Sequence, residues 1–230
     1  MKIEMHAHSS PVSPCSRVAP ADLVATYEEL GYDALVLTNH YSEYSWPDLG
    51  GTQAEKVEAY LDDYRAALAA ARTIKVFLGA EVAIRGPYSR AEFLLYGIDE
   101  DFLRRSPCLI ELSQQALYER VHAAGAVMVQ AHPFRTEFVM VPQDPRFMDG
   151  VEINCHPHHL RREEDVLYFA DWNGLLVTAG SDFHGDARPS AGILTDRPAS
   201  TVSELADILR AGVYRCFYGR ETVASPRLKK

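Results

Sequence analysis

Ligand-type side chains follow the short apolar runs of this sequence, and their positions restrict the fold more than any other feature does. The runs 34–38, 126–131 and 175–179 are continuous, which is typical of strands buried on both faces, and helical segments separate them. Strand ends are spread out in an open sheet, whereas in a closed barrel they form one ring. The residues that such a ring would bring together are His6, His8, His40, Glu81, His132, His156, Asp182 and His184. We therefore predict an α/β fold with a distorted (β/α) barrel similar to the TIM barrel; a doubly wound open sheet is the alternative.

The boundaries of the expected elements come from hydrophobic periodicity and from residues that start or stop helices. Pro20 and Gly31, for example, mark the first turn and the end of one helix. We expect strands at 2–8, 34–38, 75–82, 91–97, 126–131, 150–154, 175–179 and 215–218. Helices are expected at about 20–31, 52–72, 109–124, 162–172 and 201–211.

The composition is that of a globular protein with one core. The chain has 230 residues, of which 47% are hydrophobic and 24% charged, so we predict a single domain over residues 1–230. The formal net charge of −9 argues against non-specific binding to nucleic acids or membrane surfaces, because both need a basic face. No apolar run approaches the ~18 residues of a membrane span, and the chain begins directly with a strand, so neither a signal peptide nor a transmembrane helix is expected. The sequence does not indicate an oligomeric state.

The four cysteines, at positions 15, 108, 155 and 216, are far apart and form no Cys-x-x-Cys pair. This spacing indicates neither a disulfide framework nor a zinc knuckle, and a reducing cytoplasm is the expected location. Cys155 and Arg161 have the separation of a thiol phosphatase loop. However, the segment between them has no glycine and contains Pro157, which removes a backbone N–H, so it is poorly suited to bind a phosphate.

Two pairs of ligand-type residues with the same spacing predict a metal centre. His6 and His8 lie two positions apart on a strand, so their side chains point to one face with Cα atoms roughly 6 to 7 Å apart. Asp182 and His184 repeat this spacing after a later strand. Imidazoles with a few carboxylates favour zinc, iron or manganese over calcium or magnesium. The candidates outnumber the ligands of one tetrahedral ion, so we expect two or three divalent transition-metal ions, with Glu81 as a bridge between two of them.

A centre of this kind predicts hydrolysis of a phosphoester. Paired ions can hold a hydroxide for in-line attack on phosphorus and can stabilise the oxygens of attack and departure. We expect Glu81, Asp182 and Arg135 to serve catalysis. Arginine suits bidentate contact with an oxyanion, so the candidates for binding the substrate phosphate are Arg17, Arg135 and Arg188. Arg135 is the best placed of the three, because it follows the expected ligand His132 by three residues.

Five segments in order, taken together, resemble the PHP superfamily, which is named for polymerase and histidinol phosphatase. They are His6-Ala7-His8, Thr38-Asn39-His40, Gly79-Ala80-Glu81, Ala131-His132-Pro133 and Gly180-Ser181-Asp182-Phe183-His184. The resemblance spans nearly the whole chain. It implies a distorted barrel of about seven strands, a (β/α)7 fold, with a di- or trinuclear metal centre and phosphoesterase activity. Other members of the superfamily are accessory domains of DNA polymerases.

The sequence departs from the PHP pattern at two positions. Members of the family usually carry Asp or His in the loop after the first strand, where this chain has Cys15, our candidate replacement ligand. They often have a histidine on the strand that corresponds to 92–96, and here Glu92 is the only candidate substitute. Of the neighbouring histidines 156, 158 and 159, we expect His156 to be the ligand, because it is closest to the strand end.

Other readings explain the pattern less well. A true amidohydrolase commonly bridges its metals with a carboxylated lysine at a strand end, but Lys75 is expected at the beginning of its strand. His122 lies in the middle of an expected helix and is assigned to the helix surface. We therefore predict a metal-dependent phosphoesterase that acts on a small phosphorylated metabolite, with histidinol phosphate or a nucleotide as named possibilities. The alternative is a non-catalytic metal-binding or accessory module.

Overall fold

The computed structural model describes residues 1–43, 45, 51–85, 90–135, 140–156, 162–185, 189–219 and 221–224. In these residues no helix is both long and apolar enough to cross a membrane.

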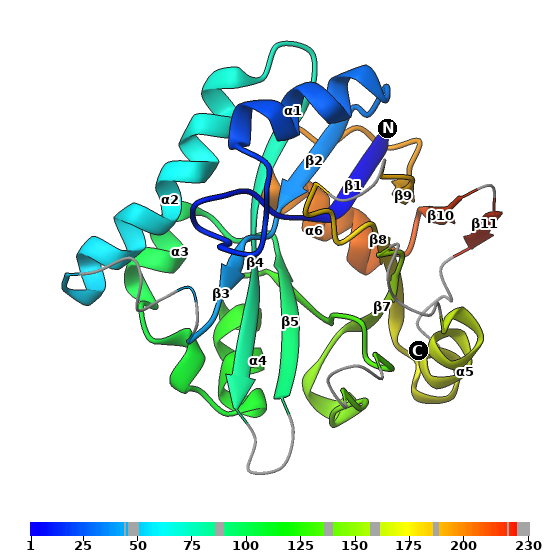
Figure 1. The fold of residues 1–230 in the computed structure, drawn as a ribbon. Coiled ribbons are helices and arrows are strands. Elements are labelled where there is room, and N and C mark those ends of the chain that lie inside the picture. The colour runs from blue at the N-terminus through cyan, green and yellow to red at the C-terminus, as the bar shows by residue number, and fades with distance from the viewer. Residues whose placement is uncertain are drawn as a thin grey trace.

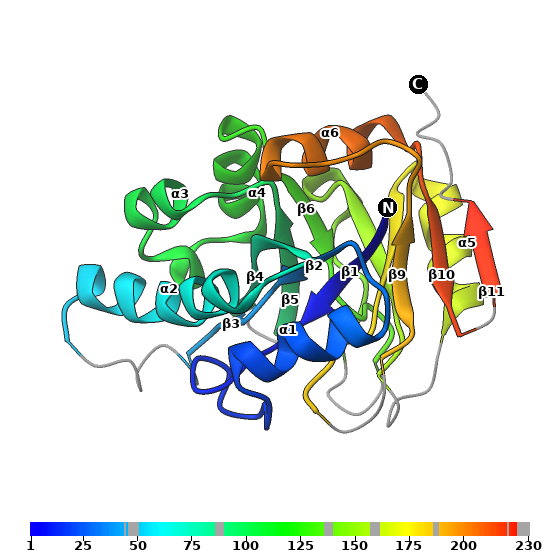
Figure 2. The same ribbon diagram turned by 90° about the horizontal axis from the view of Figure 1, so that it is seen from above.

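The strands of the described residues form one mixed sheet that is nearly closed into a barrel (Figures 1 and 2). They are β1 (Lys2–Ala7), β2 (Ala34–Leu37), β3 (His40–Tyr41), β4 (Lys75–Arg85), β5 (Arg90–Tyr96), β6 (Val127–Gln130), β7 (Gly150–Asn154), β8 (Leu176–Gly180), β9 (Ala191–Leu194), β10 (Arg215–Tyr218) and β11 (Glu221–Ala224). Their order is β11-β10-β9-β1-β2-β4-β5-β6-β7-β8, with β3 paired to β4. The end of β8 returns to β1 through a parallel bridge between Ala7 and Phe183, where the His8 N–H donates to the Phe183 carbonyl at 3.0 Å.

The expected α/β barrel is confirmed, but its sheet is mixed, whereas the strands of a regular (β/α) barrel are all parallel. β5 runs antiparallel to both β4 and β6, and β9, β10 and β11 also pair in antiparallel fashion. Only residues 86–89 separate β4 from β5, and a connection of that length has no room for the crossover that parallel neighbours need. The expectation of repeated βαβ units is therefore wrong for this part of the chain.

Helices surround the outside of the barrel (Figure 2). They are α1 (Pro20–Glu29), α2 (Gln53–Ala70), α3 (Glu100–Arg105), α4 (Gln114–Ala123), α5 (Glu163–Asn173) and α6 (Val202–Ala211), with short 3-10 turns at Leu109–Glu111 and Pro145–Phe147. α1 and α2 pack against each other, and α5 packs on β7 and β8. α3, β3, β9 and β11 were not expected from the sequence.

The helix expected at 109–124 is two elements. A 3-10 turn over Leu109–Glu111 ends at Leu112, whose ψ of 148° is extended. Ser113 then caps α4, since its hydroxyl accepts a hydrogen bond from the backbone N–H of Ala116. A serine that competes for backbone hydrogen bonds therefore starts a new helix where apolar periodicity alone suggested one continuous helix.

The first strand shows how the barrel separates its apolar core from its polar interior. Ile3 and Met5 alternate along β1 with Glu4 and His6, and all four side chains are fully buried. Ile3 and Met5 belong to the main hydrophobic core. Because alternate residues of a strand point to opposite faces, Glu4, His6 and then His8 share the other face, which carries the histidines and carboxylates of the barrel interior.

Candidate metal centre

The barrel brings together seven of the residues that the sequence singled out. Glu81, on β4, is their common neighbour, and its carboxylate approaches four imidazoles that come from β1, the residue after β1, β3 and the segment after β6. Oε1 lies 2.9 Å from His132 Nε2 and 3.4 Å from His6 Nε2. Oε2 lies 2.6 Å from His40 Nδ1 and 3.7 Å from His8 Nε2. Glu81 is fully buried, so this carboxylate is shared by imidazoles in a region without solvent.

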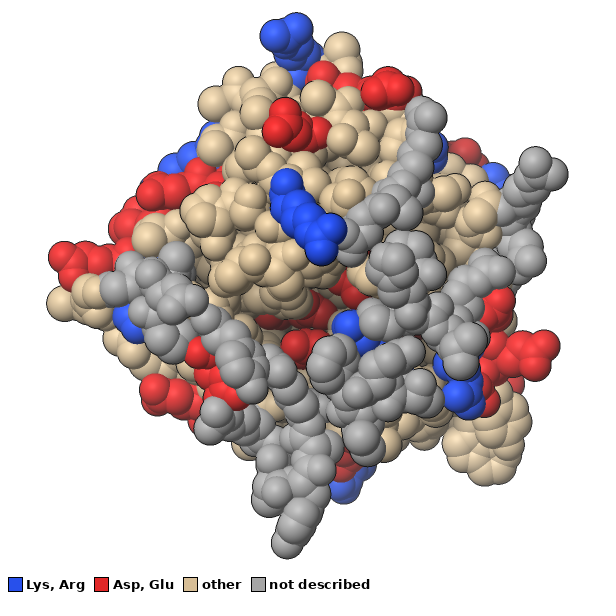
Figure 3. Space-filling model, viewed as in Figure 1, with Lys and Arg blue, Asp and Glu red and all other residues tan. Residues whose placement is uncertain are grey.

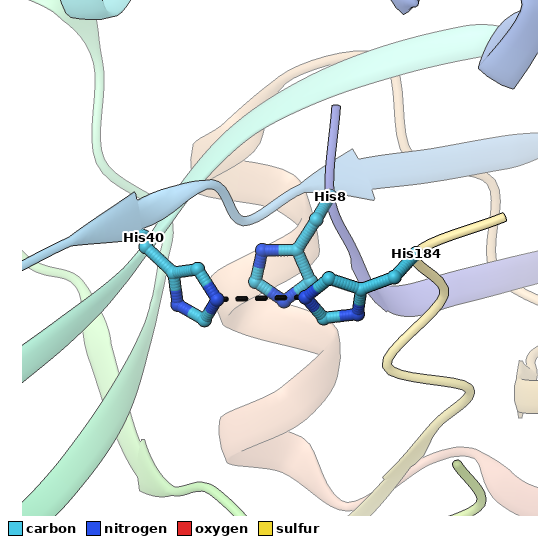
Figure 4. A group of neighbouring side chains, drawn as sticks. All are labelled: His8, His40 and His184. Atoms are coloured by element: carbon cyan, nitrogen blue, oxygen red, sulfur yellow. Dashed lines mark hydrogen bonds between the residues drawn. The ribbon is translucent and has the colours of Figure 1, made fainter. Parts of the chain in front are cut away.

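Asp182 and His184 close the cluster from the segment after β8. Asp182 Oδ1 lies 3.2 Å from His8 Nε2 and 3.4 Å from His6 Nε2. The His184 ring stacks on the His8 ring with centroids 4.3 Å apart, and its Nε2 lies 3.5 Å from His40 Nε2. Figure 4 shows these three imidazoles pointing toward one another from different elements. The two ends of the chain thus meet in one site, as the repeated spacing predicted.

The donor atoms form four overlapping groups in the described part of the chain, each with its atoms within 4.8 Å of one another. The groups are His6, His8 and Glu81; His6, His132 and Asp182; His8, His40 and His184; and His40, Glu81 and Glu92. Imidazole and carboxylate donors grouped in this way suit a divalent transition metal.

Two buried nitrogen atoms support this fit. Nε2 of His6 and Nε2 of His8 have no hydrogen-bond partner among the described residues, although both side chains are fully buried. A buried polar atom without a partner is costly, and native proteins rarely keep one without a reason. Both atoms face Glu81 and Asp182. A divalent cation between them would supply the missing interaction.

Two residues of the cluster have backbone conformations that side chains rarely adopt. His132 has a φ of 30° and Asp182 a φ of 50°, and these are the only residues other than glycine with positive φ in the described chain. Left-handed backbone of this kind costs about 1–3 kcal/mol per residue and is concentrated at functional sites. This conformation turns His132 back toward Glu81 directly after β6 ends. It likewise turns Asp182 back toward His8 directly after β8 ends.

The electrostatics keep the carboxylates ionised. Burial alone would raise the pKa of Glu81, but His40, His6 and His132 hold it well below its usual range. Burial would likewise raise the pKa of Asp182, and again the neighbouring histidines hold it well below its usual value. Both groups are therefore available as anionic ligands.

The histidines divide into two kinds. Burial lowers the pKa of His8 well below its ordinary value, and the charges of His40 and His184 lower it further, so His8 is neutral and can donate a lone pair to a metal. Burial opposes protonation of His6 too, but Glu152, Asp182 and Glu81 raise its pKa well above the usual range. An anionic cluster that attracts a proton at His6 also attracts a metal cation.

Two further candidates, Cys15 and His156, lie around this cluster. Cys15 is exposed as a residue, but its thiol is partly buried against two histidines. That burial raises the pKa of the thiol, yet hydrogen bonds with His184 and His40 outweigh it and lower the pKa to about 6. The His156 ring has its centroid 5.9 Å from that of His184. Neither residue belongs to the four groups of the described chain.

Glu92 takes the position where the PHP pattern often has histidine. Its side chain is buried, its Oε2 lies 3.5 Å from His132 Nε2, and it forms one of the four groups with His40 and Glu81. The sequence suggested it only as a substitute, and the structure places it among the donors.

The three arginines expected to bind the substrate phosphate differ in their position relative to the cluster. Arg135 is largely buried, with 17% of its side chain exposed, and its Nη1 lies 3.9 Å from Asp182 Oδ2. It lines a pocket with His132, Phe134, Asn154 and Val166, among others. Arg17 has an exposed side chain, although its backbone N–H donates to the His184 carbonyl at 3.0 Å. Arg188 lies outside the described residues. Acidic and basic side chains meet in the central hollow of Figure 3.

Two buried carboxylates behind the cluster were not recognised in the sequence. Glu4 accepts hydrogen bonds from the backbone N–H and hydroxyl of Ser181, at 2.9 and 2.7 Å, and from the Tyr27 hydroxyl at 3.0 Å. Burial raises the pKa of Glu4 to about 7. The second carboxylate is Glu152, on β7, which contacts His6. The signal for both was a glutamate inside an otherwise apolar strand, which cannot be buried without donors around it.

A second set of polar residues supports His8 from the other side. The Ser13 hydroxyl lies 3.3 Å from His8 Nδ1, donates to Asn39 Oδ1 at 3.0 Å and accepts from the His40 backbone N–H at 2.9 Å. Asn39 in turn donates to Asp63 Oδ2 at 3.1 Å. This network fixes the loop after β1 against the segment that carries His40.

The fold and this arrangement of donors define a distorted barrel with a candidate metal site at the carboxyl ends of its strands. Solved structures similar to this chain specify the fold further. A two-domain protein from Bacteroides vulgatus, described as containing a predicted PHP-like metal-dependent phosphoesterase, matches 95% of this chain with a TM-score of 0.62 and 17% identity. The chain covers 64% of that protein. The expected PHP-type barrel is thereby confirmed.

Two further structures share the fold over most of their length. PsfC from Pseudomonas syringae matches 94% of this chain and 91% of its own, with a TM-score of 0.65 and 15% identity. A protein from Chromobacterium violaceum, described as an amidohydrolase with bound sulfate and no metal, matches 90% and 96%, with a TM-score of 0.55 and 17% identity. No protein-family model and no curated protein matches the sequence at a significant level.

Proposed function

We propose that this protein is a metal-dependent phosphoesterase that hydrolyses a small phosphorylated metabolite. The observation that carries the proposal is the fully buried Glu81 carboxylate, which is shared by donor groups that also contain the unpartnered nitrogens of His6 and His8. The PHP-like phosphoesterase among the structural neighbours supports the same class, and at the coarser level these findings support a metal-dependent hydrolase.

The proposed ligands come from the four donor groups. They are His6, His8, His40, Glu81, His132, Asp182 and His184, with Glu92, Cys15 and His156 as further candidates. Glu81 would contribute to two of these groups, because its two oxygens face different histidines. Zinc, iron or manganese suits this set of imidazoles and carboxylates, and the overlap of the groups favours two or three ions. When bound, such ions would lower the pKa of a coordinated water and so supply hydroxide near neutral pH.

Residues of the chain would hold the phosphoryl group of the substrate beside the metal site. Asp182 lies between the histidines and Arg135, since Oδ1 faces His8 and Oδ2 faces the guanidinium. In that position Arg135 would hold the non-bridging oxygens of the phosphoryl group and offset the charge that develops during attack. Water adds to phosphorus, the bond to the ester oxygen breaks, and the alcohol and inorganic phosphate leave. Histidinol phosphate and nucleotides are the substrates we name, and both carry an ester of this kind.

One neighbour is described as an amidohydrolase, but a feature of this chain argues against the lysine-bridged form of that class. Lys75 opens β4, whereas Glu81 is six residues further along the same strand. Nζ of Lys75 donates to the Ala199 carbonyl at 2.7 Å and to the Ser200 hydroxyl at 2.9 Å. Its amine is therefore engaged away from the cluster.

A panel of phosphoesters, assayed on protein whose metals have been counted by elemental analysis, tests the proposal. After saturation with zinc, iron or manganese we expect at least two equivalents of metal and turnover of at least one phosphomonoester. The matched control is Glu81→Gln, which keeps the size of the side chain and removes its charge, and it should lose metal and turnover together. One ion or none after saturation would overturn the proposed centre of two or three ions. Full occupancy without turnover on any ester would favour the accessory module.

A further inference from the structure

We propose that Glu152 is a positioning residue that fixes His6 and His132 in the geometry for binding a divalent transition metal. The inference rests on the proposed metal centre and adds to it a residue that is not itself a ligand. Glu152 is fully buried on β7, at a position that the sequence gave no reason to connect with the site.

The first contact defines which nitrogen of His6 is free. Oε1 of Glu152 lies 2.7 Å from His6 Nδ1, and both side chains are fully buried. Because carboxylate oxygens accept hydrogen bonds, we assign the proton of this contact to Nδ1. Nε2 then keeps its lone pair when the ring is neutral, and it is this atom that faces Glu81 and Asp182 at 3.4 Å each. Carboxylate partners of this kind set the tautomer and basicity of metal-binding histidines.

The second oxygen of Glu152 supports two more candidate ligands. Oε2 accepts from the backbone N–H of His132 at 3.2 Å, at a residue held in left-handed backbone. It also accepts from the side-chain amide of Asn154 at 3.2 Å, and the same amide donates to Asp182 Oδ2 at 3.2 Å. The side-chain Oδ1 of Asn154 accepts from the His156 backbone N–H at 3.1 Å, which fixes the orientation of the side-chain amide. One carboxylate thus connects groups that follow or belong to β1, β6 and β8.

The neighbouring strand leaves space for these contacts. A Cβ on Gly180 would lie 2.6 Å from Glu152 Oε1 and 2.4 Å from His6 Cβ. Such distances do not occur between real atoms, so any larger residue at position 180 would push His6 and Glu152 apart. Glycine at this position is therefore part of the same arrangement.

The contacts also separate Glu152 from the ligands themselves. Both of its oxygens are occupied by N–H donors, and it belongs to none of the four donor groups in the described chain. Its effect on the metal must act through His6, His132 and Asn154. The readouts that distinguish positioning from general stability are therefore metal affinity and the protonation of His6.

The test compares zinc affinity, measured by competition with a chromophoric chelator, for the parent protein, Glu152→Gln and Thr178→Val. Loss of a partner behind a metal-binding histidine typically weakens metal affinity by about 10- to 100-fold, and we expect this for Glu152→Gln. Thr178 pairs with Glu152 across β7 and β8, and Thr178→Val removes a buried hydroxyl without touching a donor group, so it should bind zinc like the parent. In the zinc-loaded protein, long-range ¹H–¹⁵N spectra should show His6 protonated on Nδ1, and Glu152→Gln should shift that signal.

Parent-like zinc affinity in Glu152→Gln, or an equal loss in Thr178→Val, would overturn the proposal. If Glu152→Gln does not unfold cooperatively, Glu152→Asp decides in the same way, because it keeps the charge and shortens the reach of the carboxylate to His6, His132 and Asn154. The result is independent of the phosphoesterase assay. A protein that hydrolyses no phosphoester but loses zinc affinity in Glu152→Gln would refute only the proposed function. An active phosphoesterase with parent-like affinity in that variant would refute only this inference.

Discussion

Nε2 of His132 lies 2.9 Å from Oε1 of Glu81, although the two residues are 51 positions apart in the sequence. The contact depends on the left-handed backbone at His132, which turns the imidazole back over the end of β6 toward β4. A residue held in such a conformation is retained because the surrounding structure requires it. We infer that the requirement is metal binding, and this leads to the first prediction.

His132→Ala should lose metal and activity together, because it removes one donor from the group with His6 and Asp182. We expect zinc affinity to fall by about tenfold or more, which corresponds to ~1.4 kcal/mol of binding free energy. Elemental analysis after dialysis at fixed free zinc measures the loss. His122→Ala is the control, because His122 is on α4, where its Nε2 lies 2.8 Å from Asp149, and it should keep its metals. Full occupancy in His132→Ala would remove His132 from the ligand set.

The sequence predicted the barrel and the seven clustered residues because both follow from short-range patterns. Strand ends are visible as the limits of apolar runs, and ligand-type residues at those ends need only the closed barrel to converge. Where a connection was short, as between β4 and β5, the prediction of parallel strands was wrong. β9 was also missed, because it has only four residues and one of them is Gly192, a residue that is uncommon inside strands.

The supporting residues were not predictable for a different reason. Glu4 and Glu152 occupy single positions inside strands, and their roles depend on partners 177 and 146 positions away. Spacing within one segment says nothing about such partners. The polar identity of these residues was the only available signal, and it does not show which donors they meet.

Cys15→Ser should lower metal occupancy. The Cys15 thiol is hydrogen-bonded to His184 and His40, and these interactions lower its pKa to about 6, so it is largely a thiolate at neutral pH. A thiolate is a strong ligand for zinc, whereas a serine hydroxyl is not ionised at this pH. The measurement is metal content at fixed free zinc, with Cys108→Ser as the control for loss of a thiol away from the donor groups. Unchanged occupancy would show that Cys15 contacts the histidines without binding metal.

Glu58→Gln should reduce stability at neutral pH and have little effect in acid. Glu58, on α2, accepts hydrogen bonds from Arg104 at 2.7 Å and Arg65 at 2.7 Å, and these lower its pKa to about 2. A carboxyl whose pKa is lower in the folded state stabilises the fold above its unfolded pKa, and the contribution is lost as the pH falls toward 2. The difference in Tm between parent and variant should therefore shrink between about pH 4.5 and pH 2. Because the ion pairs are exposed, added salt should also reduce it, and a difference that is constant with pH would contradict the assignment.

Arg135→Ala should separate binding of the substrate from binding of metal. Arg135 Nη1 is 3.9 Å from Asp182 Oδ2, on the side of Asp182 away from His8, so the guanidinium can reach a phosphoryl group without being needed to hold the ligands. Losing an electrostatic contact of this kind typically costs about 2 to 4 kcal/mol of transition-state stabilisation, or roughly a hundred- to thousandfold in rate. We expect kcat/KM on phosphomonoesters to fall by about that factor while metal content and Tm stay near those of the parent.

The matched control for this prediction is Arg146→Ala. Arg146 is exposed and pairs with Asp144 at 2.5 Å, so its loss removes a guanidinium without touching the donor cluster. It should leave kcat/KM unchanged. If Arg135→Ala is as active as the parent on its best phosphoester, the assignment of Arg135 is wrong. Arg17 is then the next residue to test, because its backbone is hydrogen-bonded to His184 and places it at the same edge of the cluster.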